Sequence, residues 1–386
     1  MKRLAYITGS RAEYGIMRRV LKKINESRDI ELTIVATGMH IDKKYGQTYR
    51  VIEEDGFKID KLIDIQIDNS DNSKILNSMA ICQKEFGEYF QENKFDGVMI
   101  LGDRYEILSV AIAAAMHNIP LIHLHGGEKT LGNYDEFIRH AITKMSKLHL
   151  VSTEEYKDRV IQMGENPKFV FNVGALGAEN SLKMNLPTKS ELEDRFGDLN
   201  KNYFMVVFHP ETVTGVSVKE QMENLLKSLD IFKSENDFIF IGSNSDTGSD
   251  IIFDMVSKYC KDNQFKFLTS VRPEEYLALI KYSKGLIGNS SSGLIEVPSL
   301  KVPTINIGDR QKGRVRGESV IDVAANMDQI VDGIKKSQSE KFQEILKNSI
   351  NPYYQKNVAE EVCSVILEFL NSKDLNEIKD FYDLKI

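Results

Sequence analysis

Short apolar stretches that favour β-strands alternate with segments of helical spacing along most of this chain. The first stretch, residues 3–8, leads through a Gly-Ser-Arg turn into helical spacing over residues 16–24. Such alternation predicts parallel strands joined by helices that cover the sheet, and therefore an α/β protein. In the first half we expect further strands at residues 32–37, 97–101, 121–124, 148–152 and 169–173, and helices at 75–89, 107–116 and 135–145.

The alternation restarts after a polar segment, residues 185–202, whose composition is typical of a linker. We therefore predict two doubly wound Rossmann-like domains facing across a cleft, over residues 1–180 and 200–352. A last helix near residues 358–370 has a pattern that fits packing on either domain. In the second half we expect strands at 203–208, 238–242, 265–268, 285–287 and 304–307, and helices at 218–232, 251–259 and 274–282.

Composition excludes several classes of protein. The formal net charge of −7 argues against nonspecific binding to nucleic acid or to an acidic membrane surface. No stretch approaches the ~18 apolar residues of a membrane span, and the first apolar run is too short for a signal peptide. The three cysteines (Cys82, Cys260 and Cys363) lie far apart without metal-type spacing, which fits reduced thiols in the cytoplasm.

A serine-rich loop at residues 288–293 follows a short predicted strand and precedes a helix-like segment. Small residues and free N–H groups at a helix start bind anions, because the helix dipole favours negative charge there. Ser290 and Ser291 add hydroxyl donors, and Glu296 has a carboxylate suited to ribose hydroxyls. With Arg310 after the next strand, the stretch predicts a nucleotide diphosphate site. The alternative is a serine-rich N-cap on an ordinary helix.

Acid and base side chains follow two strands of the first half. Asp103 and Arg104 come after residues 97–101, and His125 and Glu128 come after the next strand. The carboxyl ends of neighbouring parallel strands meet at one edge of a sheet, so these groups are expected at one rim. Several acid/base groups at one rim predict proton transfer, whereas Asp103 taken alone is more simply an N-cap.

The next helix brings a further carboxylate to this rim, because Asp135 lies at its start. Arg139 lies four residues later on the same helix face, and the pair taken alone is a surface ion pair of little energetic value. His123 and His125 would share one side of a regular strand, but no HExxH spacing accompanies them. We therefore expect no metal.

Other candidate ligand contacts lie at strand ends of both halves. The first turn, residues 7–15, lacks the spaced glycines of a dinucleotide fingerprint, which argues against a nicotinamide enzyme. Arg11 in this turn suits a phosphate, unless it is simply solvated. His209 and Asn244 follow two strands of the second half and are candidate ligand contacts. The alternative for His209 is a buried structural histidine, and the alternative for Asn244 is a helix cap.

One family shares these motifs in this order. The chain resembles the UDP-N-acetylglucosamine 2-epimerases, in their hydrolysing branch, and among them the enzymes of bacterial sialic-acid capsule synthesis. The resemblance runs from Met1 to about Tyr382. It rests on TGSRAEYG, TGMH, GDRYE, HGGE, DEFIRH, FHPET, SNSDTGSD, GNSSSGLIEVPSL and GDRQKGR.

The resemblance implies a glycosyltransferase B-like fold in which residues 353–386 carry a helix back to the first domain. It implies conversion of UDP-N-acetylglucosamine and water to N-acetylmannosamine and UDP, without nicotinamide or catalytic metal. The acid/base carboxylates of the family correspond to Asp103 and Asp135. Many relatives have a catalytic glutamate where this chain has His125, so either His125 or Glu128 takes that role. The UDP contacts correspond to Arg11, His209, Asn244, Ser290, Ser291, Glu296 and Arg310.

Three alternatives stay open. The same chemistry can act on another UDP-sugar, such as UDP-N,N'-diacetylbacillosamine, and a reversible epimerase would keep UDP attached. A non-catalytic UDP-sugar-binding module would need the serine loop and Arg310 but not the acid/base groups. The resemblance also implies a homodimer, the cysteine usage predicts a cytoplasmic protein, and we expect neither a nucleic-acid nor a membrane partner.

Overall fold

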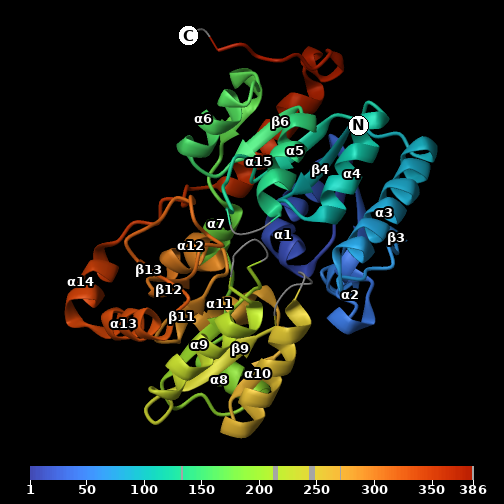
Figure 1. Ribbon diagram of the computed structural model, residues 1–386. Coiled ribbons are helices and arrows are strands. Elements are labelled where there is room, and N and C mark those ends of the chain that lie inside the picture. Colours follow the sequence, from blue (N-terminus) through green and yellow to red (C-terminus); the bar gives the residue numbers. More distant parts are fainter. Residues whose placement is uncertain (132–133, 212–215, 243–247, 270, 385–386) are drawn as a thin grey trace. The chain divides into compact units, whose positions relative to one another are not determined.

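The computed structural model describes residues 1–131, 134–211, 216–242, 248–269 and 271–384. The chain divides into two compact units (Figure 1). Unit 1 comprises residues 1–128, 135–176 and 355–386, and unit 2 comprises residues 129–134 and 177–354. Each unit is built on a parallel sheet with helices packed against it, which confirms the prediction of two doubly wound Rossmann-like domains.

The sheet of unit 1 has seven strands in the order β3-β2-β1-β4-β5-β6-β7. The order reverses between β1 and β4, and doubly wound sheets bind ligands at the carboxyl ends of the strands beside such a reversal. Its strands are β1 (Lys2–Thr8), β2 (Ile30–Thr37), β3 (Ile59–Ile63), β4 (Gly97–Leu101), β5 (Leu121–Leu124), β6 (Leu148–Val151) and β7 (Val170–Asn172).

Helices cover both faces of this sheet, so β4 and β5 are buried along their whole length, and β5 departs from an apolar run only at His123. On one face, Leu4 and Tyr6 of β1 share a core with Met17 of α1 and Ile366 of α15. On the other, α4 packs against α3 and α5 (Figure 1). The helices are α1 (Arg11–Glu26), α2 (Tyr49–Glu54), α3 (Asn72–Glu92), α4 (Tyr105–Met116), α5 (Asp135–Met145), α6 (Glu154–Gln162) and α15 (Val358–Asn371).

The sheet of unit 2 has six strands in the order β10-β9-β8-β11-β12-β13, with the reversal between β8 and β11. Its strands are β8 (Tyr203–Val207), β9 (Asp237–Ile241), β10 (Lys266–Leu268), β11 (Leu286–Gly288), β12 (Thr304–Ile307) and β13 (Val320–Val323). The helices are α8 (Lys189–Phe196), α9 (Val218–Asp230), α10 (Ser249–Asn263), α11 (Pro273–Lys281), α12 (Ser292–Ile295), α13 (Met327–Gln338) and α14 (Glu340–Asn348), and α7 (Leu176–Lys183) begins at the boundary between the units.

The interpretation of residues 185–202 as a linker was wrong, because this segment contains α8. Thr188 and Glu191 form a capping box at its start, with reciprocal hydrogen bonds of 3.3 and 2.8 Å. Leu192 and Leu199 are buried in a core of unit 2. The mostly polar composition of this segment suggested a linker, although two of its leucines belong to the core.

No helix in the described part of the chain is long and apolar enough to cross a bilayer.

Candidate active site at the strand ends

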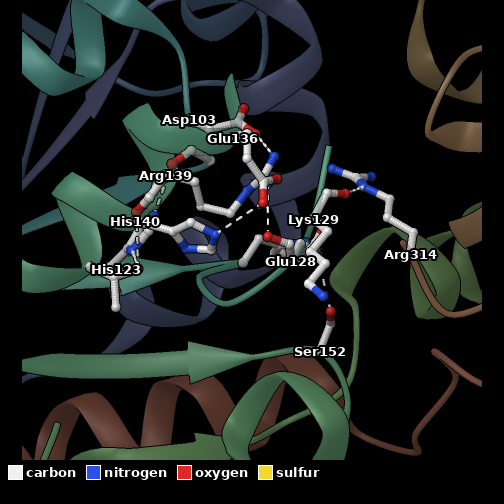
Figure 2. A network of polar contacts seen from close by, with 12 residues as sticks. Asp103, His123, Glu128, Lys129, Glu136, Arg139, His140, Ser152 and Arg314 are labelled. Carbon is white, nitrogen blue, oxygen red and sulfur yellow. Dashed lines mark hydrogen bonds and ion pairs between the residues drawn. The ribbon is translucent and has the colours of Figure 1, made fainter. Parts of the chain in front are cut away.

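Asp103, which follows β4, forms an ion pair with Arg139 of α5 (Figure 2). Arg139 is only 1% exposed and also donates from Nη1 to the backbone oxygen of Glu128 at 3.0 Å. It is therefore not the surface ion-pair partner that its spacing from Asp135 suggested. A buried guanidinium needs a carboxylate, so Arg139 fixes Asp103 and the 128 turn together at the rim of the sheet. Asp135 is the first residue of α5 and is half-buried.

His125 leaves the regular strand, because β5 ends at Leu124 and His125 has a φ of +64°. This left-handed conformation is strained for a residue with a Cβ. The His125 N–H donates to the Leu150 oxygen at 3.0 Å. Its Nδ1 lies 3.0 Å from Oε1 of Glu128. Glu128 is 2% exposed, and the same oxygen accepts from the Ser152 hydroxyl at 3.1 Å (Figure 2).

His123, two residues earlier, has a structural environment. Its Nε2 lies 2.8 Å from the Gly102 oxygen, and its Nδ1 lies 3.3 Å from the Thr143 hydroxyl. Burial lowers the pKa of His123 to about 3, so the ring is neutral near pH 7. The turn at His125 also separates the two rings that a regular strand would have aligned. Within the described residues, no group of three His, Cys, Asp or Glu side chains is arranged to hold a metal ion.

The first βα turn is occupied by the protein's own carboxylates. Glu13 Oε2 accepts the Gly9 N–H at 2.8 Å, and Glu13 is buried. Arg104 Nε lies 2.5 Å from Oε1 of the buried Glu106 and 3.8 Å from Oε1 of Glu13. Burial, and then repulsion from Glu106, raise the pKa of Glu13 to about 7. Arg104 therefore sits in a carboxylate cluster, while Arg11, the first residue of α1, is half-buried beside it.

Sequence reasoning missed Glu13 and Glu106, although a signal for Glu13 was present. Ser10 and Glu13 have the S-x-x-E spacing of a capping box, and the Ser10 hydroxyl accepts from the Glu13 N–H at 3.4 Å. That spacing places the Glu13 carboxylate near the orphan N–H groups of the helix start. Glu106 carries no comparable local signal.

In unit 2, a buried asparagine joins the strand ends around the reversal. The His209 N–H donates to Asn289 Oδ1 at 2.7 Å, and Asn289 Nδ2 donates to the His209 oxygen at 2.9 Å. The Asn289 oxygen accepts from Arg310 Nη1 at 3.3 Å and from Gln311 Nε2 at 2.8 Å. The loops after β8, β11 and β12 are thereby held together, with His209 and Arg310 in one network.

The Glu211 carboxylate holds the loop that contains Arg310 through two backbone hydrogen bonds. Its Oε1 accepts the N–H groups of Asp309 at 2.8 Å and of Arg310 at 3.0 Å. Burial raises the pKa of Glu211, and the backbone hydrogen bonds oppose that rise. Sequence reasoning treated this stretch only through His209 and missed the buried carboxylate two residues later.

The serine loop begins at a glycine that the fold requires. Gly288 has a φ of +142°, and a Cβ there would lie 1.9 Å from the Val207 oxygen. The helix-like segment after the loop is a single turn, α12, followed by a 3₁₀ turn over Val297–Leu300. Ser291 makes no side-chain cap, and Ser290 Oγ lies 3.4 Å from the Ser292 N–H. Hydroxyls and backbone N–H groups, rather than a long helix dipole, are what this loop offers an anion.

Glu296 and Asn244 complete the predicted set. Glu296 ends α12 and packs so closely against Gly177 that a Cβ on this glycine would lie 2.1 Å from the Glu296 carboxylate. Asn244, predicted as a ligand contact, lies outside the described residues. The structure thus joins Asp103 and Glu128 through Arg139 in unit 1, and His209 and Arg310 through Asn289 in unit 2.

Comparison with known proteins identifies the family. The model of a family described as UDP-N-acetylglucosamine 2-epimerase matches residues 22–367. Polysialic acid biosynthesis protein P7 of Escherichia coli is 60% identical over 384 residues, which span 100% of this chain and 98% of that protein. The GDP/UDP-N,N'-diacetylbacillosamine 2-epimerase (hydrolyzing) of Campylobacter jejuni is 40% identical over 89% of each chain.

A solved structure shares the fold. The Methanocaldococcus jannaschii UDP-GlcNAc 2-epimerase in complex with UDP-GlcNAc and UDP has a TM-score of 0.79 and 19% identity, and the match covers 94% of this chain and 99% of that one. The resemblance drawn from the motifs is therefore confirmed. This chain belongs to the UDP-N-acetylglucosamine 2-epimerase family.

Proposed function

We propose that this chain is a hydrolysing UDP-N-acetylglucosamine 2-epimerase that converts UDP-N-acetylglucosamine and water to N-acetylmannosamine and UDP. A base removes the C2 proton while UDP leaves C1, which gives 2-acetamidoglucal. Water then adds at C1 and a proton is delivered to the other face of C2. The relative named for polysialic acid biosynthesis supports a place at the first step of sialic-acid capsule synthesis.

The observation that carries this proposal is the acid/base network of unit 1. Asp103 is linked to the backbone of Glu128 through Arg139, and His125 and Ser152 contact the Glu128 side chain. A module that only binds a UDP-sugar has no need of such a network, whereas elimination and hydration both need proton transfer. We propose that Asp103, Asp135 and either His125 or Glu128 share these transfers. The relative named as hydrolyzing, at 40% identity, supports loss of UDP.

We assign the nucleotide to unit 2. Ser290, Ser291 and Arg310 would bind the diphosphate and stabilise the charge that develops on the leaving group. Glu296 would accept hydrogen bonds from the ribose hydroxyls. The remaining proposed contacts are His209, Asn244, Arg11 and Arg104. Neither a nicotinamide nor a metal is part of the proposal.

The test is incubation with UDP-N-acetylglucosamine in deuterium oxide. We expect free UDP and N-acetylmannosamine with deuterium at C2, and lower turnover in Asp103→Asn and Asp135→Asn variants that still melt cooperatively. Retention of UDP on an epimerised sugar would select the reversible reaction. Tight binding without turnover would select a binding module. Full turnover in both variants would refute the assignment of the carboxylates.

The serine loop is tested separately by measuring UDP affinity. Replacing Ser290 and Ser291 together by alanine should weaken UDP binding at least about tenfold, since hydrogen bonds to a charged group are worth about 1.5–3 kcal/mol each. Ser283→Ala is a matched control, because its hydroxyl contacts only backbone groups of Ile280 and Gly285, ahead of β11. Unchanged UDP affinity in the double variant would remove the loop from the proposed site.

UDP-N,N'-diacetylbacillosamine is the second candidate substrate, favoured by the identity to the Campylobacter enzyme. A comparison of kcat/KM for the two sugar nucleotides decides between them. We also propose that the protein is a cytoplasmic homodimer. The free thiols of Cys82, Cys260 and Cys363 support a reducing compartment, and sedimentation equilibrium measures the oligomeric state.

A further inference from the structure

We propose that Nε2 of His125 is the proton-transfer atom of the His125–Glu128 pair, and that Glu128 and Ser152 are positioning residues that hold the ring for this task. The inference rests on the proposed function and settles the choice that the HGGE motif left open. It also adds Ser152, to which no role had been given.

The contacts of Glu128 fit a residue that orients the His125 ring. Glu128 is 2% exposed, and its Oε1 already accepts from the Ser152 hydroxyl and lies within hydrogen-bond distance of His125. Its backbone oxygen is held by Arg139. Both side-chain contacts engage Oε1, so this oxygen would have to leave two partners to remove a proton from a substrate carbon. Its geometry fits orientation of the imidazole instead.

The contact with Glu128 fixes which nitrogen of His125 carries hydrogen. A carboxylate accepts, so Nδ1 donates, and the neutral ring then has its lone pair on Nε2. Nε2 makes no hydrogen bond with any described residue. His125 therefore has one nitrogen committed to the protein and one available for a proton from the substrate.

The backbone at His125 supports the same role. Its left-handed conformation turns the chain out of β5, and the hydrogen bond from its N–H to the Leu150 oxygen holds that turn. Gly127 packs against the oxygen of Tyr156, where a Cβ would lie 2.6 Å away. Strained residues persist where the surroundings fix them, and they are common at active sites.

Ser152 supplies the last link from the neighbouring strand. It follows β6 directly, is 1% exposed, and lies beside Glu128 in Figure 2. A hydrogen bond from a hydroxyl to an ionised carboxylate is stronger than one between neutral groups, so it limits rotation of the Glu128 side chain. The chain Ser152–Glu128–His125 thus runs across two adjacent strand ends towards a free imidazole nitrogen.

The decisive variants are Ser152→Ala, Ser152→Thr and His125→Ala, with Ser146→Ala as the matched control. Ser146 is an equally buried serine whose hydroxyl bonds to the Ile142 oxygen. We expect Ser152→Ala to lower kcat about tenfold with unchanged UDP affinity, since a hydrogen bond to a charged group is worth about 1.5–3 kcal/mol. Ser152→Thr keeps a hydroxyl and should therefore have a kcat close to that of the wild type. Ser146→Ala should not change kcat.

His125→Ala should lower kcat about a hundredfold or more, and added imidazole should restore part of the loss by acting as the missing base. Full kcat in Ser152→Ala would overturn the role of Ser152. Full kcat in His125→Ala, or a loss that imidazole does not restore, would overturn the role of Nε2. If Ser152→Ala does not fold, Ser152→Thr and the imidazole result decide.

One readout needs no turnover. The ¹⁵N shifts of the His125 ring should report the Nδ1–H tautomer in the wild type and its loss in Glu128→Gln, because an amide can donate to Nδ1. An Nε2–H tautomer in the wild type would overturn the inference even in an active enzyme. A wild type that shows the Nδ1–H tautomer but releases no UDP would instead refute the proposed function.

Discussion

Replacing Glu13 by glutamine is predicted to stabilise the protein above neutral pH. The Glu13 carboxyl is buried, accepts the Gly9 N–H, and shares Arg104 with the buried Glu106. Two carboxylates with one guanidinium leave one uncompensated negative charge. Burial first, and Glu106 second, therefore raise the pKa of Glu13 from 4.5 to about 7. Glutamine keeps an acceptor for the Gly9 N–H without the charge.

The sign follows from proton binding. Between pH 4.5 and 7 the folded protein holds a proton on Glu13 that the unfolded chain has released, so stability falls as pH rises through this window and is constant above it. A pKa that moves from 4.5 to about 7 corresponds to about 3 kcal/mol of unfolding free energy, at 1.36 kcal/mol per unit. Relative to the wild type, Glu13→Gln should therefore gain about 3 kcal/mol between pH 4.5 and pH 8.

Urea unfolding of both proteins at several pH values from 4.5 to 8 measures this difference. Glu191→Gln is the matched control, because Glu191 holds the same capping-box position in α8 but has its pKa lowered by the Thr188 N–H. The stability that ionised Glu191 contributes is lost only as pH falls below 4.5, which is outside the measured window. The difference in unfolding free energy between Glu191→Gln and the wild type should therefore stay constant from pH 4.5 to 8. A Glu13→Gln difference that is flat with pH, or that falls as pH rises, would refute the reasoning.

Three further perturbations test other parts of the structure. Arg139→Met should cost about 3–5 kcal/mol because it leaves Asp103 without its guanidinium, and Asp103→Leu in the same chain should recover part of the loss in urea unfolding. Gly288→Ala should cost about 3 kcal/mol or more through the Cβ contact with the β8 backbone, whereas Gly46→Ala, with open space around its Cβ, should cost about 1 kcal/mol by thermal unfolding. Asn289→Ala should weaken UDP binding in calorimetry by separating the loops it joins.

The positions of the strand ends were predictable because they follow from short-range pattern. Apolar runs that stop at Gly102 and at His125 place polar residues at the carboxyl edge of a parallel sheet, whatever the details of packing. The strand expected at residues 97–101 agrees with β4, and that at 121–124 agrees with β5. The grouping of Asp103, His125 and Glu128 at one rim therefore needed only the order of strands.

The partners of these groups were not predictable from local spacing. Helical periodicity places Arg139 on the same face as Asp135, but it cannot tell whether that face meets solvent or the end of β4, which comes much earlier in the chain. The same applies to Arg104, which the sequence places only after a strand and which the fold surrounds with Glu13 and Glu106. Burial of a charged group is a tertiary property, and only its capping-box spacing gave Glu13 a local signal.

The two units share one topology but differ in the groups at the reversal of strand order. In unit 1 the turn after β1 gives its Gly9 N–H to Glu13, so a carboxyl group of the protein occupies a donor that a phosphate would use. In unit 2 the corresponding strand ends carry a neutral amide, Asn289, and the cation Arg310 beside the serine loop. The first position therefore offers an anion one donor fewer, whereas the second has a cation beside serine hydroxyls. This difference is the physical reason to assign the nucleotide to unit 2 and proton transfer to unit 1.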